Sequence, residues 1–196
     1  MNFIKRDFTL MSMMLIPVAI AINIVAGQLT AILKLPIFLD AIGTILVSIL
    51  AGPWVGAATG FLSNAINSIF DPGFFPFSLV SIAIGIVTGI LARKNMFSKF
   101  WKLLISGFLI ALTSTIVAAP IVAFLFGGVT GSGNTLITGA LMATGQNLIQ
   151  SVFASQFISD IADKIISILI SFTIIKSMSD KYLIKFPLGD RFISKK

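Results

Sequence analysis

The sequence predicts an all-α integral membrane protein, a compact bundle of about six transmembrane helices with both termini on the cytoplasmic side. Of the 196 residues, 57% are hydrophobic and only 11% are charged, whereas a soluble domain has about 25% charged residues. The mean hydropathy of +1.04 points the same way. Each helical crossing takes roughly 20 apolar residues, so a chain of this length holds five or six helices. We therefore expect one membrane domain over residues 1–196.

Six apolar segments follow one another and are separated by turns or charged residues. The first ends at a Lys-Leu-Pro sequence (34–36), the second at a Gly-Pro turn, the third at an Asp-Pro-Gly turn and the fourth at a basic loop. Gly and Pro interrupt regular structure, so these positions mark the ends of helices. The predicted spans are residues 8–33, 37–51, 55–70, 77–92, 101–126 and 157–178.

Three segments depart from the simple pattern of full crossings. The runs 37–51 and 55–70 are short for a bilayer, so we expect them to be tilted or buried among neighbouring helices. A single re-entrant hairpin made of both runs is the alternative, and it would leave four full spans. Residues 134–156 are less apolar and are predicted to form an outer helix that is interfacial or partly buried.

The basic residues are distributed unevenly along the predicted topology. With six spans, one face collects 12 of the 14 basic residues, whereas Lys34 lies on the other face and Lys164 lies within the last span. By the positive-inside rule the first face is cytoplasmic, which predicts a multi-pass protein of the cell membrane, such as a bacterial plasma membrane. The 12 residues are Lys5, Arg6, Arg93, Lys94, Lys99, Lys102, Lys176, Lys181, Lys185, Arg191, Lys195 and Lys196.

The composition argues against catalysis, metal binding and cofactor binding. The chain has no cysteine and no histidine, and all seven acidic residues are aspartates. The common metal ligands and the usual general base near neutral pH are therefore missing. There is also no phosphate-binding loop of the Walker type, so the chain is not expected to hydrolyse nucleotides itself. The net charge of +7 comes from chain ends and one loop, which does not indicate a nucleic-acid partner.

Polar residues inside apolar segments indicate a binding site, because lipid makes them costly unless they are buried or paired. In the predicted topology they gather in the outer half of the bundle, above an apolar inner half. A polar cavity that opens outward is typical of a small-molecule binding site. A channel would need polar residues along its whole length. The predicted substrate-binding residues are Asn64, Asn67, Lys164, Asp160, Asp163, Gln28, Asp40, Phe75, Gln146 and Asn147.

Some of these residues have a structural interpretation as well. Asp160 and Lys164 are four residues apart and can neutralise each other as an ion pair on one helix face. Asp40 can cap the helix that follows it. Phe75 belongs to an aromatic outer loop, 74–77, which could close over a ligand.

Three local patterns resemble one known family. They are LPIFLDAIGT at 35–44, AGPWVGA at 51–57 with Asn64 following, and SDIADKII at 159–166. Together with the chain length and six predicted spans, they resemble the substrate-binding S components of energy-coupling factor (ECF) vitamin transporters. The resemblance covers nearly the whole chain.

The resemblance implies a high-affinity vitamin binder that docks on a transmembrane coupling protein and two ATPase subunits. Many members dock through an Ala-x-x-x-Ala pattern on the first helix, and the nearest positions here are Ala19 with Asn23 and Gly27 with Ala31. Pairing of Lys164 with a carboxylate favours pantothenate as the ligand. Hydroxymethylpyrimidine, pyridoxine and riboflavin-like ligands remain open, because Asn and Asp side chains also suit such rings.

Two other functions remain open from the sequence. A stand-alone ion-coupled secondary transporter would use Asp160 or Asp163 as a proton or sodium site. However, no inverted repeat is evident, although such repeats are common in that class. A membrane sensor module, with its signalling domain on another chain, is the third possibility.

Overall fold

A computed structural model describes residues 2–193, and within this range the chain forms helices and no strand, which confirms the all-α prediction. Lys195 and Lys196, which we assigned to the cytoplasmic face, lie outside the described residues. The elements are α1 (Asn2–Asp7), α2 (Leu10–Ile32), α3 (Ile42–Ala51), α4 (Pro53–Phe70), η1 (Pro72–Phe77), α5 (Ser78–Arg93), α6 (Phe100–Leu125), α7 (Asn134–Ala143), α8 (Leu148–Ser177), α9 (Asp180–Leu183) and η2 (Gly189–Phe192).

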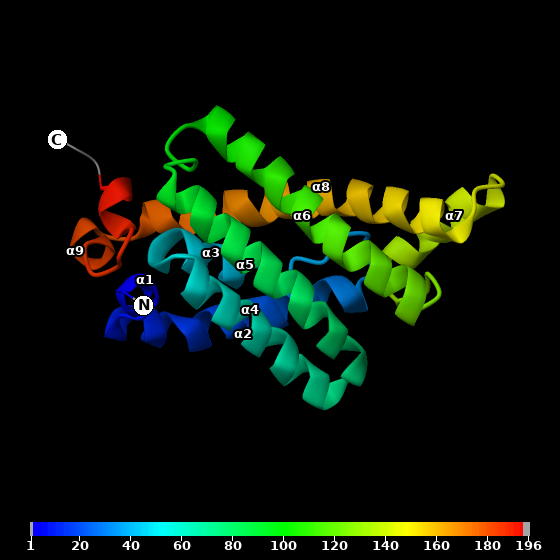
Figure 1. The fold of residues 1–196 in the computed structure, drawn as a ribbon, viewed down its shortest axis with the longest axis horizontal. Helices are drawn as coiled ribbons and strands as arrows, with labels where there is room; N and C mark the ends of the chain where they lie inside the picture. Colours follow the sequence, from blue (N-terminus) through cyan, green and yellow to red (C-terminus); the bar gives the residue numbers. More distant parts are fainter. Residues whose placement is uncertain (1, 194–196) are drawn as a thin grey trace.

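The longer helices run roughly along the long axis of the molecule and define two ends (Figure 1). The N-terminus, α1 and α9 lie together at one end, which we call the basic end because most basic residues of the described chain belong to it. The helix α7 and the beginning of α8 lie at the opposite end. The charge distribution predicts that the basic end is cytoplasmic.

Three segments are long and apolar enough to cross a membrane: Leu10–Ile32, Pro72–Arg93 and Phe100–Leu125. The helix α8 is longer than all of them, but its middle carries Asp160, Asp163 and Lys164. The six crossings and the cytoplasmic termini therefore stay predictions.

The short helix α3 lies at the centre of the bundle. All ten of its residues are buried, and it packs against α2, α4, α5 and α8. A ten-residue helix is only about 15 Å long, which is half the thickness of the hydrocarbon core. Protein surrounds α3 instead of lipid, so the expected burial of this short run is confirmed. Its side chains Ile45, Ile49 and Leu50 join the main hydrophobic core.

Helices α4 and α5 pack closely because glycines face each other along their contact. A Cβ atom on Gly85 would lie 2.5 Å from the backbone carbon of Gly56, and one on Gly60 would lie 2.6 Å from the backbone oxygen of Ser81. Such distances leave no room for a side chain. Gly56 and Gly60, which are four residues apart on α4, therefore serve packing against α5 inside the bundle, as small residues do between membrane helices.

The last third of the chain differs from the predicted helix boundaries. Residues 134–156 do not form one helix: α7 ends at Ala143, a turn follows, and α8 begins at Leu148 rather than near residue 157. Gly145 has a φ of +92°, which L side chains rarely adopt. The Asn147 side chain then caps α8 by accepting a hydrogen bond of 2.9 Å from the Gln150 backbone N–H. Consequently Asp160 lies near the middle of α8 and not at its start.

Candidate functional site

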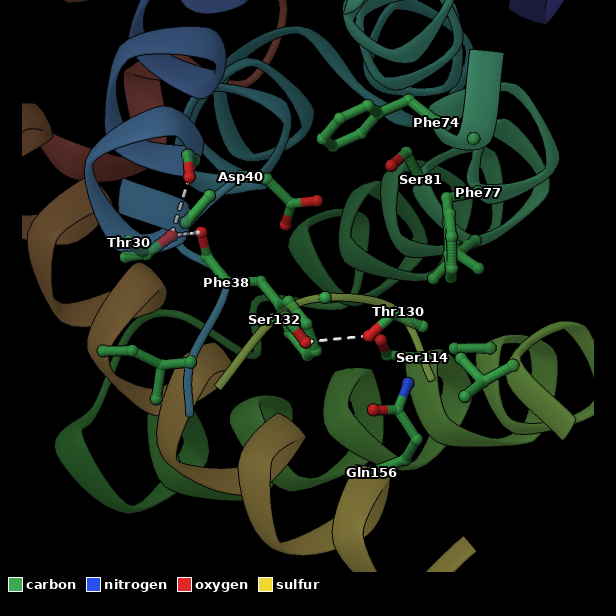
Figure 2. A pocket seen from close by; sticks show the side chains of 18 of the residues that line it. Thr30, Phe38, Asp40, Phe74, Phe77, Ser81, Ser114, Thr130, Ser132 and Gln156 are labelled. Carbon is green, nitrogen blue, oxygen red and sulfur yellow. Dashed lines mark hydrogen bonds between the residues drawn. The ribbon is translucent and has the colours of Figure 1, made fainter. Parts of the chain in front are cut away.

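A cavity of about 580 Å³ lies in the half of the bundle away from the basic end. Its walls come from the end of α2, the segment 33–41, η1, α5, α6, the loop 126–133 and the middle of α8. Figure 2 shows Asp40, Phe74, Ser81 and Gln156 around a common space. The volume falls in the range of pockets that hold small molecules.

Aromatic side chains form one part of the wall. Phe77 and Phe126 stack with ring centroids 5.5 Å apart, and Phe74 lies nearby in η1. In a 3₁₀-helix, residues three apart share a side, so Phe74 and Phe77 both line the cavity. Phe75, which we predicted as a binding residue, does not line the cavity and is 56% exposed.

Four charged side chains contribute to the middle of the site. Lys164 forms an ion pair with Asp163, and its Nζ lies 3.9 Å from Oδ1 of Asp160, so the predicted pair four residues apart is present. These three side chains are at most 2% exposed. Buried charges are tolerated when they are paired and hydrogen-bonded. Asp40 belongs to the same group, because its carboxylate interacts electrostatically with Lys164.

Hydroxyl groups from α6 complete the environment of Asp160. Ser114 donates to Oδ1 over 2.9 Å, and Thr115 donates to Oδ2 over 2.7 Å. The carboxylate therefore joins α6 to α8. We did not predict either hydroxyl from the sequence, although a Thr-Ser-Thr stretch (113–115) inside an apolar helix was a signal for it.

Asp163 holds the segment 33–41 against α8. Its Oδ1 accepts hydrogen bonds from the backbone N–H groups of Leu39, over 2.6 Å, and Phe38, over 3.2 Å. Thr30 of α2 donates to the carbonyl oxygen of Phe38 over 2.6 Å. Asp163 does not itself line the cavity, so its role here is to position the segment that contains Asp40.

Asp40 and Gln28 both line the cavity. The carboxylate of Asp40 points into the cavity (Figure 2). The alternative interpretation of this residue as a helix cap is wrong, because the residue at the cap of α3 is Ala41, and no side chain makes a capping hydrogen bond there.

The two asparagines of α4 are buried behind the cavity wall. Asn64 donates to the hydroxyl of Ser81 over 2.6 Å, and Ser81 lines the cavity. Asn67 is 7% exposed and does not line it. Asn64 therefore positions the wall residue Ser81 and does not itself line the cavity.

Gln146 and Asn147 are not brought to the cavity. Both are exposed in the turn between α7 and α8, and Asn147 caps α8. The nearby residue that does line the cavity is Gln156, whose Oε1 accepts a hydrogen bond from Asn134 of α7. From the sequence, Gln156 is only the last residue of the less apolar segment 134–156. The N-cap at Asn147, which starts α8 early, explains the difference.

The predicted docking positions on α2 mostly face the inside of the bundle. Ala19 is fully buried, and its backbone oxygen would lie 2.1 Å from a Cβ on Gly43. Asn23 is 1% exposed and donates to Thr44 and Ser63, each over 2.9 Å. In this conformation neither residue is available to a partner.

The other pair on α2 lies beside the cavity. A Cβ on Gly27 would lie 3.2 Å from the Cβ of Asp40, and both Gly27 and Ala31 line the cavity wall. Of the four docking positions, Ala31 is exposed. The exposed face of α2 instead consists of other apolar residues, among them Met14, Val18 and Val25.

The comparison with protein families gives one match. The family model described as "ECF transporter, substrate-specific component" matches residues 11–175, which is most of the chain. No curated protein and no solved structure matches the chain.

Proposed function

Because the chain belongs to the family of substrate-specific components of ECF transporters, we propose that the cavity is the site at which it binds a vitamin or vitamin precursor with high affinity. The family places the chain among membrane subunits for uptake of a small molecule. The observation that carries the proposal is the cavity of about 580 Å³, with aromatic walls and buried polar groups. Such a site binds and orients a ligand, and we propose no catalytic role for it.

We propose further that the loaded subunit delivers its ligand to a transmembrane coupling protein and two ATPase subunits. The chain would cross a plasma membrane six times, with the basic end in the cytoplasm. In that orientation the cavity opens toward the outside, where the ligand is captured. An apolar exposed face on α2 supports contact with lipid or with another membrane protein.

The first prediction is that the purified chain binds its ligand alone in detergent, with a Kd of about a micromolar or tighter. Native mass spectrometry of the purified chain measures the mass of any bound compound, and calorimetry measures its affinity. Ala118 lines the cavity and is 3% exposed, so Ala118→Phe would fill the cavity and abolish binding. Ala140 is exposed on α7 and does not line this cavity, so Ala140→Phe is the matched control.

Two results would count against this proposal. The first is a chain that binds none of the common vitamins or precursors and carries no bound compound after purification. The second is uptake in cells that survives loss of the ATPase subunits but stops with an uncoupler. That second result would favour the ion-coupled secondary transporter, with Asp160 in the cavity as the ion site.

The second prediction concerns the wall residue Ser81. Replacing Asn64 by alanine removes the donor that holds the Ser81 hydroxyl, so we expect affinity to fall about three- to tenfold, the usual worth of one hydrogen bond. Ser81→Ala should lower the affinity by a similar factor. The double variant should bind the ligand no more weakly than the weaker-binding of the two single variants. Gln150→Ala, an exposed amide on α8, is the control. Calorimetry with unchanged affinity in both single variants would contradict this role.

A further inference from the structure

From the charges around the cavity we propose that its ligand is an organic cation with an aromatic ring, and that the cavity discriminates against carboxylates. This inference rests on the proposed function, because it concerns the same cavity. It also differs from the expectation that Lys164 pairs with a ligand carboxylate such as that of pantothenate.

Acidic side chains outnumber basic ones in the cavity lining. Asp40, Asp71 and Asp160 line the cavity, and Lys164 is the one basic residue among its described lining residues. Asp163 forms an ion pair with Lys164. The complete chain has a net charge of +7 with only seven aspartates, so four of its seven acidic side chains gather around this one cavity. Such a concentration does not follow from the composition.

The ammonium group of Lys164 is already paired with aspartates. Lys164 is paired with Asp163 and lies 3.9 Å from Asp160, and its charge also interacts with that of Asp40. Its Nζ donates a hydrogen bond to Asp163 and lies at ion-pair distance from Asp160. A ligand carboxylate would have to compete with these aspartates for Lys164 and would be repelled by them.

A cation meets the opposite situation. The carboxylate of Asp40 points into the cavity (Figure 2), and Asp71 is an exposed carboxylate at the cavity wall. A positive group beside either carboxylate would gain charge-assisted hydrogen bonds, which are about twice as strong as neutral ones.

The aromatic wall adds a second attraction for the same class of ligand. Phe74, Phe77 and Phe126 line the cavity, and Figure 2 shows the rings of Phe74 and Phe77 beside it. Aromatic faces attract cations, and aromatic rings stack on one another. A flat ring that carries an amine or a quaternary nitrogen would stack on the phenylalanine rings and also pair with the carboxylates. A carboxylate on the same ring would gain only the stacking.

The test uses three probes that share one pyridine ring and differ in one substituent: pyridoxamine carries an ammonium, pyridoxine a hydroxyl, and 4-pyridoxate a carboxylate. Calorimetry on the purified chain in detergent gives the three affinities. We expect pyridoxamine to bind at least about tenfold more tightly than 4-pyridoxate. In parallel, thiamine and pantothenate are measured as an unrelated cation and anion, and any copurified compound is identified by mass spectrometry.

The variant Asp40→Asn should reduce the preference for pyridoxamine over 4-pyridoxate about tenfold. Asp180→Asn makes the same change on an exposed residue of α9 at the basic end, and it should leave the ratio unchanged. If Asp40→Asn does not fold, as judged by thermal unfolding, Asp71→Asn is measured in its place, because that carboxylate is exposed.

The outcomes separate the inference from the proposed function. Preference for the cations, or a copurified cation, supports the inference. Equal or tighter binding of 4-pyridoxate or pantothenate, or a copurified anion, would overturn it and leave the cavity as the binding site. An unchanged ratio in Asp40→Asn would also overturn it. A chain that binds no probe and carries no compound would overturn the proposed function, and the inference with it.

Discussion

Replacing Lys164 by methionine is expected to destabilise the folded chain by about 3–5 kcal/mol, because it removes the positive partner of buried carboxylates. Asp160 and Asp163 are 1% and 0% exposed, and both are paired with Lys164. Methionine keeps the length of the side chain, so the loss is mainly electrostatic. Titration with sodium dodecyl sulfate in mixed micelles measures the free energy of unfolding, and thermal unfolding gives a second reading.

A rescue variant makes this prediction specific. Adding Asp163→Asn to Lys164→Met removes one of the two uncompensated charges and should recover part of the loss. Lys176→Met, on an exposed residue of the same helix, should change stability by no more than about 0.5 kcal/mol. A Lys164→Met chain as stable as the wild type would show that the charge cluster is not needed for the fold. A loss of ligand binding in Lys164→Met is informative only where the variant remains folded.

The variant Gly85→Ala is expected to disrupt the contact between α4 and α5, at a cost of about 1–3 kcal/mol or more. The new Cβ would lie 2.5 Å from the backbone carbon of Gly56 and 2.6 Å from the backbone nitrogen of Ala57. Backbone atoms cannot rotate away as a flexible side chain can, so the two helices must separate. Because α5 carries Ser81 and Ile84 into the cavity wall, ligand affinity should fall together with stability. Detergent-based thermal unfolding and calorimetry measure the two effects.

The matched control is the same substitution at Gly139 of α7. A Cβ there meets no atom within 4 Å, and alanine has a helix propensity about 1 kcal/mol better than glycine. Gly139→Ala should therefore be neutral or slightly stabilising. If Gly85→Ala behaved like Gly139→Ala, the close approach of α4 and α5 would not exist as the structure has it.

Helix positions follow closely from the sequence where local signals are strong. The predicted span 101–126 corresponds to α6 at Phe100–Leu125, and 55–70 corresponds to α4 at Pro53–Phe70. Long apolar runs, Gly-Pro turns and charged loops act over a few residues, so they can be recognised without knowing the neighbours. The start of α8 differs from the prediction because residues 148–156 mix polar and apolar side chains. The capping role of Asn147 was a weak local signal.

The lining of the cavity could be predicted in part. Four of the predicted substrate-binding residues line it, namely Lys164, Asp160, Asp40 and Gln28, whereas their contact with a ligand stays a prediction. Asn64 does not line the cavity but donates a hydrogen bond to Ser81, which does. Hydropathy identifies a polar residue that needs a partner, but it does not say whether that partner is a ligand or another side chain.

The sequence by itself determined the class of this protein: an all-α membrane chain with a basic end, apolar helices and a small set of costly polar residues. These properties follow from composition and from patterns within single segments. The tertiary structure alone decided which polar residues meet. Asp163 holds the backbone of Leu39, which is 124 residues away, and Asp160 joins Ser114 on another helix. Those pairings depend on how the helices rotate and cross. They place Lys164 next to Asp160 and Asp163 at the wall of the cavity.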